Sequence, residues 1–308
     1  MSNGKEWSLE VVKTYNKRNM VNKFDVLENL IKYLLEQKKF FKIVPIENLF
    51  EKSNKKINVS LRYDVDADIN TAIKCSKLME KNKIFSTFYL LHTGVYYRNR
   101  KYTDKLVRHS DLKENILNIK NKYTSIGLHI DPLYVDIEFK QDGTKEVLDE
   151  INWLNSFCSC IKTISTHNSC GLFGAENFEI FEELTLNNRK SYTFNNIEYP
   201  LGKLSLQNLD LIEVNYPIIK NTEKVRLFPK NIDRKELMKM SVHDNDVFYH
   251  KYNINIWCCG KDQWIVSNNR DNTYDIVKYT EVIDYLDFIK YDNSNTIVFN
   301  LHPVYFAL

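Results

Sequence analysis

The chain has 308 residues, of which 43% are hydrophobic and 13% aromatic, so it can bury a sizeable core and is not a disordered polypeptide. Its 43 basic and 40 acidic residues are mixed along the sequence and leave a net charge of +3, without the basic stripe that nucleic-acid binding requires. The N-terminus lacks a secretory signal, and no apolar run approaches the roughly 18 residues of a membrane span. These features predict a soluble, cytoplasmic protein.

The predicted elements begin with a helix, because apolar residues recur with a period of 3.6 from Phe24 to Leu35. From about residue 57 short apolar strands alternate with amphipathic helices. Strands are expected at 57–66, 85–92, 125–131 and 161–167, and helices at 70–83, 112–123, 145–157 and 176–186. After a less regular stretch, a helix at 279–291 and a buried strand at 295–303 are expected. Four successive strand–helix units predict a parallel sheet, open or closed into a barrel.

The stretch LRYDVDAD, residues 61–68, places acids on alternate positions directly after an apolar strand. A calcium loop of the EF-hand type is excluded, because its sixth and twelfth positions would be Ile69 and Cys75 instead of Gly and Glu. Asp68 is predicted to be the N-cap of the helix that begins near Asn70.

An N-cap role does not account for Asp64 and Asp66. Both lie on one face of the predicted strand, so their charges require a cation or a shared proton. The structural alternative for these acids is an ion pair with Arg62, which lies on the same face.

Two histidines follow apolar runs at the same end of the predicted sheet as Asp66. They are His129, in SIGLHID, and His167, in TISTHNS. Because loops at the carboxyl ends of parallel strands converge, these three side chains are expected to meet there. Two imidazoles and a carboxylate are the ligand set of an open catalytic site for a divalent metal, which lowers the pKa of water and polarises a carbonyl. His302, which closes the last strand, is a candidate acid for the leaving group, or a buried histidine bonded to the backbone.

The motifs LRYDVDAD, FSTFYLL, IGLHIDP, STHNS and VFNLHP, in this order, resemble the polysaccharide deacetylase superfamily (NodB homology, carbohydrate esterase 4-like). The similarity is greatest to a divergent branch found among surface-polysaccharide biosynthesis proteins. It implies an irregular (β/α)7-type barrel, a distorted TIM barrel, over residues 51–308. Residues 1–50 are then a helical extension packed on the barrel.

The resemblance also implies roles for individual residues. Asp64 corresponds to the catalytic base of the family, Asp66 and His129 to metal ligands, and His302 to the acid that protonates the leaving group.

The family's second motif has a further histidine four residues after the first, and Leu133 stands at that position here. The third metal ligand is therefore expected to come from elsewhere. His167 is the expected ligand and Asp131 the alternative.

The implied reaction is the hydrolysis of an N-acetyl or O-acetyl group on a sugar or glycan precursor, assisted by a divalent metal. Zinc is the expected ion, although other divalent ions also fit a ligand set of two histidines and an aspartate. Two alternatives stay open. One is a metal-dependent amidohydrolase that acts on another C–N bond, and the other is a catalytically inactive relative that binds glycans in an assembly system.

Overall fold

The structure is a computed structural model that describes residues 24–49, 51, 56–99, 106–167, 175–185, 188–214, 217–219, 248–250, 254–258, 263–268, 273–278, 281–292 and 296–307. The chain divides into two compact units, residues 1–127 with 252–308 and residues 128–251. The expected boundary at residue 50 stays a prediction, and residues 1–23 and residue 50 lie outside the described residues.

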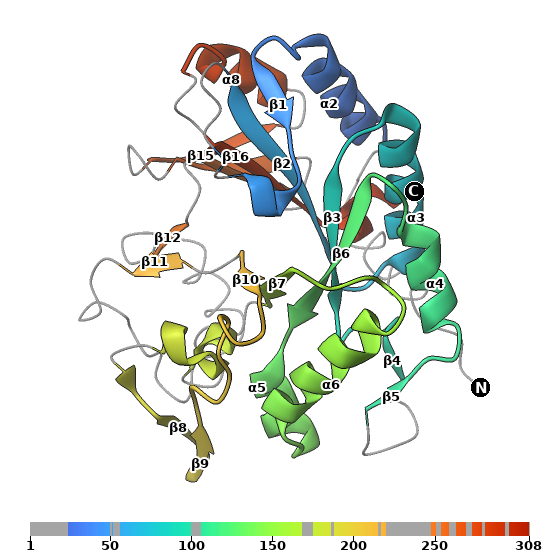
Figure 1. Ribbon diagram of the computed structural model, residues 1–308. Coiled ribbons are helices and arrows are strands. Elements are labelled where there is room, and N and C mark those ends of the chain that lie inside the picture. The colour runs from blue at the N-terminus through green and yellow to red at the C-terminus, as the bar shows by residue number, and fades with distance from the viewer. Residues whose placement is uncertain are drawn as a thin grey trace. The chain divides into compact units, whose positions relative to one another are not determined.

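The first unit contains most of the strands and the longest described helix, α3 (Figure 1). The helices are α2 (Phe24–Glu36), α3 (Ile69–Asn82), α4 (Leu112–Ile119) and α8 (Val282–Ile289). The strands are β1 (Phe41–Ile43), β2 (Ile57–Val65), β3 (Ser86–Leu91), β4 (Arg98–Asn99), β5 (Val107–Arg108), β13 (Ile254–Cys258), β14 (Gln263–Asn268), β15 (Thr273–Lys278) and β16 (Thr296–Leu301). Short 3-10 helices cover Ile46–Asn48 and Pro303–Phe306.

The second unit contains one long helix, α6, and otherwise short elements. Strand β6 (Thr124–Ile130) contains the division between the two units. It is followed by α5 (Pro132–Tyr134), a π-helical turn (Val135–Phe139), α6 (Gly143–Asn155), β7 (Thr163–Thr166) and the 3-10 helices η3 (Asn177–Ile180) and η4 (Glu182–Leu184). The remaining strands are β8 (Ser191–Phe194), β9 (Ile197–Pro200), β10 (Ile212–Glu213), β11 (Pro217–Ile219) and β12 (Phe248–His250).

The main sheet has the strand order β10-β7-β6-β3-β2-β16-β13-β14-β15, with β1 paired to β2. Strands β1, β3 and β16 run parallel to their neighbour β2, and β7 runs parallel to β6 and β10. The fold is mixed α/β, and six parallel strands form a curled half-barrel that is compatible with a distorted barrel. The last two strands, β14 and β15, are antiparallel additions to it.

Strand β2 is the centre of the first unit, since all nine of its residues are buried. A parallel strand in the middle of a sheet is covered on both faces, and here the four polar residues that alternate with the apolar ones, Asn58, Ser60, Arg62 and Asp64, are buried as well. Helix α3 begins directly afterwards, and its N-cap is Asp68, whose carboxylate accepts a hydrogen bond of 3.0 Å from the backbone N–H of Thr71. The predicted N-cap is therefore confirmed, and the cap fixes where the chain turns away from the end of β2.

The prediction of a helix at 176–186 is wrong. The described part of this stretch forms η3 and η4, which are separated by Phe181 in an extended conformation (φ −92°, ψ 130°). Phe181 forms a parallel bridge with Leu204, and the backbone atoms of Ile180 and Glu182 bond to Leu204 on either side. This pairing with a distant segment replaces the helical hydrogen bonds that the local pattern predicted.

The other predicted strands and helices named above are confirmed, with ends that shift by a few residues. Within the described residues, no helix combines the length and the apolar character that crossing a bilayer would need.

Candidate metal centre

The predicted site residues lie at the carboxyl ends of parallel strands. Asp66 follows β2 directly, His129 is the penultimate residue of β6, His167 follows β7, and His302 follows β16. In the register of β6 and β7, His129 is opposite Ser165, so that the two histidines come from adjacent strand ends.

Three of these residues are brought together. Asp66, His129 and His167 each offer one ligand atom, and these three atoms lie within 4.8 Å of one another. The rings of His129 and His167 are nearly perpendicular, with centroids 5.1 Å apart. A carboxylate oxygen and two imidazole nitrogens are the donors that zinc and related divalent ions take in open catalytic sites. We call these three residues the candidate metal cluster, and its donor set fits a divalent cation.

His129 is held by the main chain of the neighbouring strand. Its side chain is buried, and its Nδ1 atom lies 2.9 Å from the carbonyl oxygen of Ser165. A carbonyl oxygen only accepts, so the hydrogen is on Nδ1, and the lone pair of Nε2 is left to bind a metal. Strand pairing thus fixes both the orientation and the tautomer of this ligand.

His167 is held by a side chain. Its Nδ1 atom lies 3.2 Å from Oδ2 of Asp131, a buried carboxylate whose Oδ1 accepts a hydrogen bond of 2.9 Å from Asn177. Metal-bound histidines commonly donate their second N–H to a carboxylate in this way. Asp131, the alternative third ligand, therefore contacts the Nδ1 side of His167. The candidate metal cluster contains His167 and not Asp131.

Asp64 is in a different environment from Asp66. It is buried, and its two carboxylate oxygens accept hydrogen bonds of 2.7 Å and 2.5 Å from Nε and Nη2 of the buried Arg62. The ion pair that the sequence left open is present. Arg62 also stacks over the ring of Tyr89, which lies in β3 beside Asp64.

His302 lies beside the candidate metal cluster. Its Nε2 atom is 3.6 Å from Oδ2 of Asp66, and its side chain is 21% exposed. The partial exposure gives a substrate or water access to this imidazole, as an acid in catalysis would require.

Two residues that sequence reasoning missed support Asp66 from behind. The buried Tyr96 donates a hydrogen bond of 2.8 Å to the carbonyl oxygen of Val65, and both burial and the charge of Asp66 hold its pKa well above the usual value. At Gly94, a Cβ atom would lie 2.8 Å from the carbonyl oxygen of Asp66, so that any other residue would force these atoms to shift. Neither role has a local sequence signal.

The end of β7 has a similar support. The buried Glu213 of β10 accepts hydrogen bonds of 3.0 Å from both the backbone N–H and the hydroxyl of Thr166. This contact fixes the strand end from which His167 follows.

Leu133, at the position of the family's second histidine, is buried and faces an apolar cluster. That cluster contains Ala175, Tyr192 and Leu201. A leucine side chain has no atom that binds a metal, and the cluster contains His167 as its third residue instead.

No family model matches the chain, and no curated protein or solved structure does either. The relation to the polysaccharide deacetylases consequently depends on the motifs quoted above and stays a prediction.

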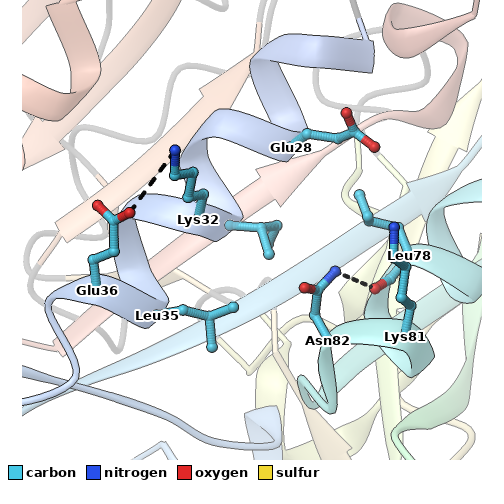
Figure 2. A pocket seen from close by; sticks show the side chains of 8 residues that line it. Glu28, Lys32, Leu35, Glu36, Leu78, Lys81 and Asn82 are labelled. Atoms are coloured by element: carbon cyan, nitrogen blue, oxygen red, sulfur yellow. Dashed lines mark hydrogen bonds and ion pairs between the residues drawn. The ribbon is translucent and has the colours of Figure 1, made fainter.

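A groove in the first unit is unrelated to these residues. Figure 2 shows that it lies between α2 and the end of α3, and its walls include Glu28, Lys32, Leu78 and Lys81. Lys32 and Glu36 form an ion pair there. None of the predicted site residues lines the groove.

Proposed function

We propose that the chain is a divalent-metal-dependent hydrolase that removes an acetyl group from a sugar or glycan precursor. The observation that carries this proposal is the candidate metal cluster of Asp66, His129 and His167. The order of the motifs supports the choice of substrate class. The proposal includes zinc as the ion, the irregular (β/α)7 barrel and the packing of residues 1–50 on its outside.

A divalent cation bound by the cluster would lower the pKa of a water molecule toward neutrality and polarise an acyl carbonyl. Asp64 accepts the proton of the attacking water. Because each carboxylate oxygen has two lone pairs, the bonds from Arg62 leave Asp64 with acceptor capacity for this proton. His302, beside Asp66, donates a proton to the departing amine or alcohol.

The test is acetate release from acetylated sugar nucleotides and oligosaccharides. The zinc-loaded protein is expected to release acetate, and treatment with a chelator is expected to stop the reaction. Asp64→Asn and His302→Ala are each expected to lower the rate by about 10²- to 10⁴-fold, the usual contribution of a general base or acid.

A matched control for Asp64→Asn is Asp149→Asn, because Asp149 is an exposed acid paired with Lys145 on α6. This variant is expected to keep the wild-type rate. Normal turnover by Asp64→Asn would remove the assigned base.

One observation favours a second candidate, a metal-binding glycan-assembly protein without turnover. Asp64 is engaged by Arg62 through both oxygens, as a purely structural acid would be. Zinc binding that depends on His129 and His167, together with glycan binding and no acetate release, would identify this function.

A further inference from the structure

We propose that Asn177 is a positioning residue of the candidate metal cluster and acts on His167 through Asp131. This inference rests on the metal site of the proposed function. Sequence reasoning assigned Asn177 no role.

Asn177 joins three segments of the second unit. Its Nδ2 atom donates to Oδ1 of Asp131 at 2.9 Å and to the carbonyl oxygen of His167 at 2.8 Å. Its Oδ1 atom accepts from the backbone N–H of Leu133 at 3.1 Å. With 1% of its surface exposed, the side chain has both amide hydrogens and its oxygen engaged within the protein. Such a residue holds the segments after β6 and β7 in one arrangement.

The consequence for Asp131 is a fixed carboxylate. Oδ1 is bound by Asn177, which leaves Oδ2 directed at Nδ1 of His167, 3.2 Å away. Without the amide, the Asp131 carboxylate can turn, and the imidazole loses the partner that keeps its hydrogen on Nδ1. The Nε2 lone pair would then no longer be reserved for a metal. Loss of such an outer partner commonly costs about 10- to 100-fold in metal affinity.

His129 provides a control inside the same molecule. Its Nδ1 is bound by the main-chain carbonyl of Ser165, which a substitution of Asn177 does not remove. If Asn177 works through Asp131, its replacement affects His167 and leaves His129 as it was. A general loosening of the fold would affect both rings.

The first experiment determines histidine tautomers in the metal-free protein at neutral pH, by long-range ¹H–¹⁵N NMR with assignment through His129→Ala and His167→Ala. In wild type both rings are expected to carry the hydrogen on Nδ1. In Asn177→Ala and Asn177→Asp, His167 is expected to become a mixture of tautomers, while His129 is unchanged. Asn177→Asp keeps an oxygen for the N–H of Leu133 but loses both donors. An unchanged His167 in both variants would overturn the proposal.

This readout needs neither metal nor substrate. If the wild-type protein binds no zinc and releases no acetate, the proposed function fails, whereas the link from Asn177 to His167 is still decided by the tautomers.

The second experiment measures zinc affinity against a chromophoric chelator in a double-mutant cycle. Asn177→Ala is expected to weaken binding about 10- to 100-fold, and Asp131→Ala by a similar factor. In the Asp131→Ala background, Asn177→Ala is expected to have little further effect, because the two residues act in series. Equal losses in both backgrounds would show that Asn177 acts independently of Asp131 and would overturn the proposal.

Asn58→Ala is the matched control. Asn58 is also buried and also donates two hydrogen bonds to main-chain carbonyls, those of Leu49 and Glu51. Neither of these bonds involves Asp131 or a cluster residue, so the replacement of Asn58 is expected to lower the stability without changing zinc affinity. A loss of zinc affinity as large as that of Asn177→Ala would assign the effect to stability alone.

Discussion

Arg62 binds both carboxylate oxygens of Asp64, which lies two residues further along the same buried strand. Side chains two residues apart share one face of a strand, so the guanidinium can bind the acid within the buried strand. The two acids of the DVD sequence thereby differ in role: Asp64 has a fixed cation within the protein, while Asp66 belongs to the candidate metal cluster.

Replacing Arg62 is expected to be costly because the Asp64 charge would stay buried without its guanidinium. Arg62→Met should lower the free energy of unfolding by about 3–5 kcal/mol, the usual effect of removing one partner of a buried pair. The double variant Arg62→Met with Asp64→Asn should recover much of the loss, since the buried charge is then absent. Denaturant unfolding measures both. Equal losses in the two proteins would mean that the pair is not what stabilises this strand.

A second prediction concerns the contact between Gly94 and the backbone of Asp66. An alanine Cβ at position 94 would lie 2.8 Å from the carbonyl oxygen of Asp66 and 2.9 Å from the ring of Tyr96, so these atoms must move. Gly94→Ala is expected to lower the stability by about 1–3 kcal/mol, as overpacking does, and also to weaken zinc binding.

Gly202→Ala separates these two effects. Gly202 has a φ of +63°, a conformation that strains any residue with a Cβ, but its neighbours are Thr185 and Glu182 and not the cluster. This variant is expected to be less stable and to bind zinc normally. If Gly94→Ala binds zinc as tightly as wild type, then Asp66 tolerates the movement that the alanine Cβ forces.

The local sequence predicted the elements whose patterns are themselves local. The strand pattern of β2 and the 3.6-residue period of α3, with Asp68 between them, are visible without any knowledge of the rest of the chain. The stretch 176–186 also has a helical pattern, but its pairing with Leu204 is a long-range contact that the pattern does not contain. Short aromatic-rich strands were expected between about residues 190 and 270 but were given no bounds, and β14 and β15 lie at the end of this stretch and just after it.

The same distinction applies to the site. Asp66, His129 and His167 could be selected as candidate ligands from residue type and position alone, because each follows an apolar run. Asn177 gave no signal, because its role depends on a hydrogen bond to Asp131, 46 residues earlier in the chain. Side chains that hold ligands in place are recognised only when the segments they join are seen together.

A third prediction follows from a half-buried acid in the second unit, Glu176. Burial and the nearby Glu179, partly offset by Arg189, raise the pKa of Glu176 from 4.5 to about 8. The folded protein therefore keeps a proton that the unfolded chain releases above pH 4.5. The contribution of this proton to the free energy of unfolding is complete below pH 4.5 and is lost as the pH rises through 8.

Glu176→Gln is expected to remove this loss, because the amide stays neutral at every pH. The variant should match wild type near pH 4.5 and become the more stable protein as the pH approaches 8, which thermal unfolding at a series of pH values would measure. Glu182→Gln, at an exposed neighbouring position, should not open such a gap. A constant difference between Glu176→Gln and wild type across this range would contradict the raised pKa.

The last prediction restores the histidine of the family pattern at position 133. Leu133 packs in the apolar cluster. An imidazole at this position is therefore expected to be buried among apolar side chains and not to reach the metal ligands. Leu133→His is expected to lower the free energy of unfolding by about 2–4 kcal/mol and to leave zinc affinity no higher than in wild type. Leu133→Met, which nearly conserves volume, should cost less than about 1.5 kcal/mol. Tighter zinc binding by Leu133→His would show instead that this segment can turn toward the cluster and that the third ligand depends on which residue the position offers.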